Sequence, residues 1–185
     1  MRNPLRRGTP VPAAVVARAG LPRGDKVLTG AVADDGSWLL GTRDRLVIVP
    51  PDADAPVRAV AWERVETADW DREAERLQVV EVGEFGRPRP EHTFTVADPG
   101  DVLPMIRERV TASVLLQRRV PVRGRKGLLV IARRPPRGRG EIVWAYELDA
   151  GLAPDDPDVR AAAERGLRAA QDELGPGDEP IGRSI

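Results

Sequence analysis

One amphipathic segment, residues 98–120, places the strongest constraint on the fold of this chain. Asp98 can cap the free amide groups of a helix start, and Pro99 fits the first helical position. Apolar residues then recur at spacings of three and four, with others beside them: Leu103, Ile106, Val110 and Val114, then Val102, Met105 and Leu115. The pattern predicts one helix from Asp98 to Val120, with arginines in its last turn and Pro121 as its stop.

A helix with one apolar face needs a layer to pack against, and the preceding residues supply one. Short β-branched segments, separated by turn residues such as Asp34-Asp35-Gly36 and Pro50-Pro51, are typical of antiparallel strands. We predict strands over 26–33, 37–42, 45–49, 57–62, 62–71 with a bend at Arg64, 76–82 and 91–97. Together they predict an antiparallel meander that the helix closes.

The residues after this helix predict a smaller second part. Two strands, 128–133 and 141–148, precede a helix that begins at Asp156-Pro157 and ends before Gly175. We therefore expect four parts in the chain: a flexible arm over 1–24, a domain over 25–120, a strand–strand–helix extension over 121–175 packed on that domain, and a loose tail over 176–185.

Composition excludes several kinds of chemistry. The 185 residues include no cysteine and a single histidine, His92, so disulfides, thiol catalysis and cysteine-ligated zinc are excluded. No run approaches the roughly 18 apolar residues of a membrane span. The apolar stretch 11–17 is short and is broken by Pro12, so we interpret it as neither a secretory signal nor an anchor. We expect a cytoplasmic protein without metal or cofactor.

Two strand patterns resemble a known family. Residues 39–49 hold an apolar pair, then Thr42, then Arg45 at the start of an apolar strand. Residues 61–65 place a tryptophan and an acid before a hairpin that contains Asp69-Trp70-Asp71. Both patterns, with the closing helix, are similar to bacterial pleckstrin-homology-like (PH-like) domains over residues 25–120. The frequent Ala, Arg, Gly, Pro and Asp are typical of high-GC genomes such as those of actinobacteria.

This resemblance implies an α+β, mainly β fold. The expected structure is an antiparallel, bent, barrel-like sheet capped by one C-terminal helix, with the β-hairpin and helix of the extension added. Bacterial members of the family mostly have no assigned ligand and are regarded as interaction scaffolds. Eukaryotic relatives often bind phosphoinositides through a basic pocket, but the matching region here mixes Lys26, Arg43 and Arg45 with acids and forms no phosphate cradle.

Charge is unevenly placed although the net charge is zero. Residues 118–139 hold nine basic residues and no acid, between acidic segments at 52–101 and from Asp149 onward. The basic block is either a partner surface or an internal match to the acidic parts. Its hairpin supplies the candidate contacts to a polyanion or partner: Arg123, Arg125, Lys126, Arg133, Arg134, Arg137 and Arg139. No aromatic residue is interleaved for base stacking.

No catalytic constellation stands out. His92 lies between Glu91 and Thr93 on a strand, where we interpret it as structural or merely exposed. The acids of residues 69–75 lie at a turn, and we interpret them as a solvated corner rather than an acid–base pair. We therefore expect no enzyme, but a PH-like interaction or scaffold module whose partner is another protein. The alternative is binding of nucleic acid or an anionic surface through the basic hairpin 118–139.

Overall fold

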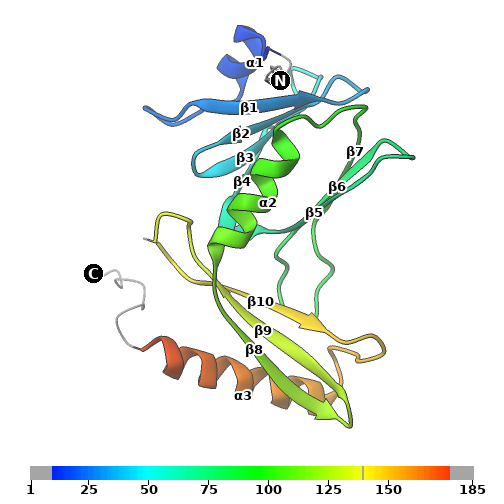
Figure 1. Ribbon diagram of the computed structural model, residues 1–185, viewed down its shortest axis with the longest axis vertical. Helices are drawn as coiled ribbons and strands as arrows, with labels where there is room; N and C mark the ends of the chain where they lie inside the picture. The colour runs from blue at the N-terminus through cyan, green and yellow to red at the C-terminus, as the bar shows by residue number, and fades with distance from the viewer. Residues whose placement is uncertain (1–9, 139, 176–185) are drawn as a thin grey trace, which may run out of the picture. The chain divides into compact units, whose positions relative to one another are not determined.

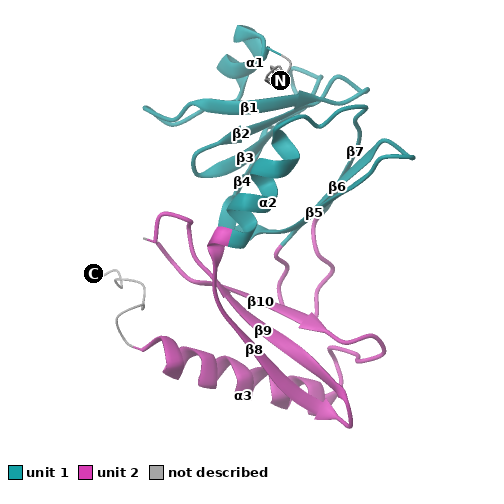
Figure 2. Cartoon of the chain, viewed as in Figure 1, with its two compact units in different colours: residues 1–81, 91–111 teal, residues 82–90, 112–185 magenta. Residues whose placement is uncertain are grey.

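The chain forms two compact units, each with its own hydrophobic core. The computed structural model describes residues 10–138 and 140–175. Unit 1 comprises residues 1–81 and 91–111, and unit 2 comprises residues 82–90 and 112–185 (Figure 2). The fold is α+β and mainly β, as predicted, with three antiparallel sheets and a helix near the C-terminus (Figure 1).

The first sheet of unit 1 is covered on both faces. Its four antiparallel strands lie in sequence order: β1 (Val27–Val32), β2 (Trp38–Thr42), β3 (Arg45–Val49) and β4 (Arg58–Ala61). Leu39 and Leu46 face the main core, whereas Leu40 and Val47 pack on the opposite face against the N-terminal arm. A strand that is buried on both faces is apolar throughout, which explains the continuous apolar run of β3.

The second sheet of unit 1 follows a sharp corner. Its parts are the 3₁₀ turn η1 (Trp62–Arg64) and the strands β5 (Val65–Asp71), β6 (Arg76–Glu81) and β7 (Glu91–Thr95), in the order β5-β6-β7. The turn lies where the sequence predicts a bend. Trp62 fills the corner and is fully buried. Unit 1 thus contains two separate sheets, and its described strands do not close into a barrel.

Helix α2 (Val102–Ser113) is shorter than the predicted helix over 98–120, and that prediction is wrong at both ends. Residues 98–101 form a turn, in which the Asp98 carboxylate accepts the Gly100 N–H. The chain leaves the helix at Ser113 and continues as strand β8 (Val114–Arg123), which includes Pro121. Val102 and Ile106 of α2 are buried in the main core of unit 1.

Unit 2 is a three-stranded sheet with a helix on one face. Strands β9 (Lys126–Arg133) and β10 (Val143–Leu148) join β8 in the order β10-β9-β8, so the extension has three strands rather than the two predicted. Helix α3 (Pro157–Leu174) packs Val159 and Ala163 against Val120 and Val130 of the sheet. The predicted cap is confirmed, because the Asp156 carboxylate accepts the Asp158 N–H and Pro157 follows it.

Residues 82–90 belong to unit 2, although they connect two strands of unit 1. The ring of Phe85 meets the ring of Tyr146 edge-on, with centroids 5.1 Å apart. The Arg89 guanidinium donates to the Tyr146 carbonyl at 3.1 Å. A loop that reads as a plain connection in the sequence therefore contributes an aromatic residue to the core of unit 2.

The described part of the N-terminal arm packs on unit 1. Helix α1 (Ala13–Arg18) leads into Ala19, which is buried with Leu40 and Val47 of the first sheet. Arg18 Nη1 donates to the Pro50 carbonyl at 2.7 Å. Residues 1–9 of the predicted arm and the predicted tail 176–185 lie outside the described residues. None of the helices in the described ranges has the length and apolar character needed to cross a membrane.

Candidate functional site

The basic hairpin predicted as a contact surface makes contacts within its own unit. Arg123, at the end of β8, donates to Asp156 Oδ1 at 2.9 Å and to Asp158 Oδ2 at 2.8 Å. Lys126 Nζ donates to the Ala150 carbonyl at 2.9 Å. Arg125 lies exposed on the turn between β8 and β9. Two of these three cations are therefore engaged by the segment that leads into α3.

The other predicted contact residues lie in different surroundings. Arg133 is buried and its guanidinium donates to Ser113 Oγ at 3.1 Å. Arg134 is half-buried, and its backbone N–H donates to the Ser113 carbonyl. Arg137 is exposed in the β9–β10 loop, whereas Arg139 lies outside the described residues. Of the described residues in this group, Arg133 is buried and Arg134 is only partly exposed, so these two do not form one exposed face with Arg123 and Lys126.

Acidic residues of unit 2 balance the charge of β8. Arg119 pairs with Asp149, and Arg118 pairs with Glu173 of α3. Hydrogen bonds and charge from Asp149 raise the pKa of Arg119, and those from Asp158 and Asp156 raise the pKa of Arg123. The hydrogen bonds from Arg119 and the Gly127 N–H lower the pKa of Asp149. These contacts favour the interpretation that the basic block pairs with acidic segments of the same chain and is not a partner surface.

Removing the acids that face Arg123 tests this match. The double change Asp156→Asn and Asp158→Asn frees the guanidinium, while asparagine keeps the helix cap. We expect tighter heparin binding, with the dependence of log K on log salt concentration steeper by about one. Fluorescence titration with labelled heparin at several salt concentrations measures both quantities.

A matched control removes the same charge elsewhere. Asp155→Asn with Asp172→Asn changes two exposed acids that form no ion pair within the described ranges. This control should bind heparin almost as weakly as the unaltered chain. If the two double variants bind heparin with equal affinity, Asp156 and Asp158 do not prevent Arg123 from binding a polyanion.

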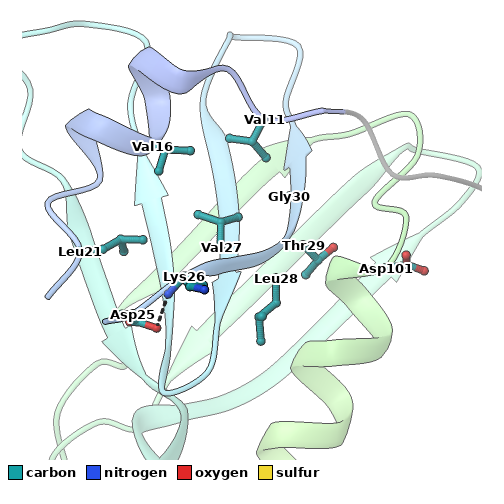
Figure 3. Close-up of a pocket in the computed structure, with 10 residues that line it drawn as sticks. All are labelled: Val11, Val16, Leu21, Asp25, Lys26, Val27, Leu28, Thr29, Gly30 and Asp101. Carbon is teal, nitrogen blue, oxygen red and sulfur yellow. Dashed lines mark hydrogen bonds between the residues drawn. The ribbon is translucent and has the colours of Figure 1, made fainter. Parts of the chain in front are cut away.

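A groove follows the free edge of the first sheet of unit 1 (Figure 3). Its volume is about 500 Å³. Four consecutive residues of β1, Val27 to Gly30, line it. Side chains on one face of a strand alternate, so four consecutive lining residues place the groove along the strand edge. Strand β1 pairs only with β2 in the described sheet, which leaves this edge open.

The backbone of β1 presents unpaired groups to this groove. Ala33 N–H donates to the Ser37 carbonyl, so Ala33 faces β2. By the alternation of an antiparallel ladder, Ala31 also faces β2, whereas Gly30 and Val32 turn their N–H and C=O groups outward. Within the described part of the chain, no hydrogen bond to the backbone of Gly30 or Val32 comes from that side. Gly30 is buried and Val32 is exposed, so the accessible part of this edge is at Val32, and a strand that also paired with Gly30 would displace the side chains that cover it.

A β-bulge exposes an apolar side chain in the middle of the groove. The β1–β2 register shifts between Val27 and Thr29, so Leu28 is the extra residue. Leu28 is 54% exposed, the most exposed large apolar side chain of the described residues. Val11, Val16 and Leu21 from the arm line the groove on the other side of β1 from the Leu28 side chain (Figure 3). The arm approaches closely because Gly30 has no Cβ, which would lie 2.4 Å from Val11 Cγ2.

Charged side chains mark the two ends of the groove. Figure 3 shows Asp101, just before α2, beyond Thr29, and Lys26 at the opposite end. Both side chains belong to exposed residues. Asp25 is also at the Lys26 end, but its carboxylate faces Arg45 at 3.9 Å and is largely buried. The groove thus has an apolar middle, an acidic end and a basic end.

A second polar cluster in unit 1 links its two sheets. Glu81 at the end of β6 is buried, and Arg58 of β4 donates to it through Nε and Nη2 at 3.0 and 2.7 Å. His92 Nε2 of β7 lies 2.7 Å from Glu81 Oε1. Burial opposes the charged form, but the hydrogen bonds from Arg58 and His92 hold the pKa of Glu81 below its ordinary value. His92 therefore has a structural contact, and Arg58 and Glu81 were missed in the sequence.

The low pKa of Glu81 makes unit 1 sensitive to acid. A carboxyl group whose pKa is lower in the folded state stabilises that state above its ordinary pKa of 4.5 and loses the contribution as pH falls through the folded value. Glu81→Gln removes the charge that Arg58 faces and should lower the unfolding free energy by about 1–3 kcal/mol at pH 7. The loss is no larger because the Arg58 side chain is half exposed, so water screens its charge. Urea unfolding should show the difference from the unaltered chain shrinking between pH 5 and pH 3. A difference that stays constant over this range would contradict the assignment.

The acidic corner after β5 is a turn. Asp71 Oδ1 accepts the N–H groups of Glu73 and Ala74 at 3.0 and 3.1 Å. This carboxylate therefore shapes the β5–β6 connection. In the ranges that the structure describes, no group of three or more His, Cys, Asp or Glu side chains is placed to hold a metal ion.

A comparison with protein-family models finds no match for the chain, and comparisons with curated proteins and with solved structures find none either.

Proposed function

We propose that the chain is a non-catalytic interaction module of the cytoplasm, in which unit 1 is a PH-like domain that binds a partner protein. Seven strands in a four-stranded and a three-stranded antiparallel sheet, followed by α2, support the PH-like assignment. Unit 2, with α3 on its sheet, extends this module. The partner binds unit 1 in the groove along β1.

The open edge of β1 is the observation that carries the proposal. Proteins generally cover, charge or shorten an exposed strand edge, because unpaired N–H and C=O groups recruit other strands. Here the edge instead lies in an apolar groove, with Leu28 54% exposed at its centre. Burying the exposed half of that side chain against a partner is favourable by roughly 1 kcal/mol. An open edge and an apolar side chain at one place suit a protein partner.

Polyanion binding through the hairpin 118–139 is the less favoured function. A phosphate that approached Arg118, Arg119 or Arg123 would compete with carboxylates already paired with those guanidinium groups. The same surface would also present the acids themselves to the polyanion. In the described part of the chain, Lys26 and Asp101 at the ends of the groove form no ion pair.

Capture of the partner from the cells that make the protein tests the proposal. A tagged chain is compared with Leu28→Asp and with Leu115→Asp, which changes another exposed strand leucine, on β8. The capture is run with and without nuclease and high salt, which remove nucleic acid. We expect one protein that the unaltered chain and Leu115→Asp retain and that Leu28→Asp loses.

Two results would overturn the proposal. One is the absence of any captured protein that depends on Leu28. The other is nucleic acid as the main captured species, released by changing Arg137 to alanine. Because Leu28 is exposed, Leu28→Asp should melt within a few degrees of the unaltered chain, which separates lost binding from lost folding.

A further inference from the structure

We infer that the occupant of the β1 groove is an extended peptide segment of the partner, added to β1 as an antiparallel strand. We further infer that the segment carries a basic, an apolar and an acidic residue in that order, at alternate positions. This inference rests on the proposed function, since it names the chemistry that the groove of unit 1 recognises. Backbone pairing, Leu28 and the end charges each contribute one part of it.

Backbone pairing favours an extended strand over a helix or a compact surface. Gly30 and Val32 each turn one N–H and one C=O outward, two residues apart, which is the spacing that an added strand satisfies. Strand addition uses these groups for affinity and leaves alternate side chains of the peptide to give specificity. Between its first and last turns, a helix has its backbone N–H and C=O groups bonded to one another, so it cannot pair with β1 along its length.

Leu28 selects the central residue of the segment. It lies midway along the groove, and its side chain extends on the side of β1 away from Val11, Val16 and Leu21 of the arm (Figure 3). A peptide side chain on the same side of the sheet would pack against Leu28 and bury it. Cross-strand apolar pairs stabilise a sheet, so a valine, isoleucine or leucine fits this position.

The end charges select the flanking residues and the direction of the chain. Lys26 precedes β1, and Asp101 lies at the other end of the groove, beyond Thr29 (Figure 3). An antiparallel segment enters at the Asp101 end and leaves at the Lys26 end. Its first flanking residue must therefore be basic and its last acidic. A parallel segment would need the reverse order, so the order of charges reports the direction.

The groove walls favour a single strand over a second copy of this chain. In a symmetric pair each copy would bring its own arm and its own residues before α2 to the shared edge. Those residues already flank β1 on both sides of the groove. A lone extended segment needs only the width of one strand, about 4.8 Å from β1.

Two synthetic peptides of identical composition test the inference. The first reads Thr-Ser-Arg-Thr-Val-Thr-Glu-Ser-Thr, and the second exchanges Arg and Glu. Fluorescence anisotropy with the full chain should show the first binding about tenfold more tightly, because two attractive cross-strand pairs become repulsive in the second. N-methylation of the peptide amides that face β1 should abolish binding of the first peptide.

A charge-exchanged protein supplies the decisive control. Lys26→Glu with Asp101→Lys reverses both ends of the groove and keeps the net charge. This variant should prefer the second peptide by a similar factor. Equal binding of the two peptides, binding of neither, or indifference to N-methylation would overturn the inference.

The outcomes also separate the inference from the proposed function. If a partner depends on Leu28 but the two peptides bind equally well, the proposed interaction module is retained. The inference that the partner adds a strand with ordered charges is then rejected. A Leu28-dependent dimer, seen by analytical ultracentrifugation, would name a second copy as the occupant and overturn the inference. Loss of every Leu28-dependent partner removes the proposed function itself.

Discussion

Replacing Trp62 with alanine is expected to lower the unfolding free energy of unit 1 by about 3–5 kcal/mol. The indole is fully buried at the corner between β4 and β5 and belongs to the core that both sheets and α2 share. Its Nε1–H donates to the carbonyls of Thr42 and Arg43, both at 3.2 Å. Alanine would leave a cavity there and two carbonyls without this donor.

A conservative variant separates the two contributions. Trp62→Phe keeps a buried six-membered ring but loses the donor and the pyrrole ring, so we expect a smaller loss of about 1–3 kcal/mol. Urea unfolding followed by circular dichroism measures both variants. Hydrogen exchange should locate the loss in β2 to β5, with the amides of β9 unaffected, because β9 belongs to unit 2. A loss below about 1 kcal/mol for Trp62→Ala would contradict the role of this residue as the corner of the core.

The strands and α3 are predictable because their local signals agree with their final packing. The turn residues Asp34-Asp35-Gly36 separate β1 from β2, as the sequence indicates, and Asp156-Pro157 starts α3 where the cap predicts. In these segments the same residues set both the local conformation and the buried face. Residues 62–64 also bend the chain near the predicted position.

The predicted helix over 98–120 fails because its second half fits two periodicities. Residues 114–120 place apolar side chains at helical spacing, but alternate residues from Leu116 to Val120 also suit a strand. Pairing with β9 decides between the two. The ladder runs from Val114 opposite Arg133 to Arg123 opposite Lys126, and only the later hairpin partner reveals it. Residues 114–120 therefore form a strand because pairing with β9 outweighs their local helical periodicity.

The groove and the charge pairs were not predictable from local sequence. The groove combines the arm near Val11, strand β1 near Leu28, and Asp101 before α2, and no spacing rule links these three segments. The exposed bulge at Leu28 depends on the register with β2. For the basic hairpin, the composition is consistent with a partner surface and with ion pairing inside the chain. The carboxylates in and near α3 favour ion pairing inside the chain.

Gly166→Val is expected to lower the unfolding free energy of unit 2 by about 3 kcal/mol. At Gly166, α3 lies close against the sheet. A Cβ at this position would lie 2.6 Å from Val120 Cγ2 and 2.8 Å from Val130 Cγ2. Both valines are buried, so neither has free space to move into. Valine adds two more methyl groups to this contact, which must push the helix away from β8 and β9.

The control for Gly166→Val lies on the exposed side of the same helix. Ala161→Val introduces the same β-branched side chain without a contact to the sheet, and should cost less than about 1 kcal/mol. Thermal unfolding followed by circular dichroism compares the two variants. A similar small loss in both would show that α3 does not need close approach at Gly166.

Displacing α3 should also change the charge that unit 2 presents. Asp158 and Glu173 reach Arg123 and Arg118 from opposite ends of this helix. If packing at Gly166 holds those carboxylates in place, folded Gly166→Val should bind heparin more tightly than Ala161→Val, measured below the melting temperature of both. Unchanged heparin binding in a destabilised Gly166→Val would mean that the ion pairs survive the shift of the helix. In that case the neutral surface of β8 depends on the length of the arginine side chains rather than on the fit of α3 to the sheet.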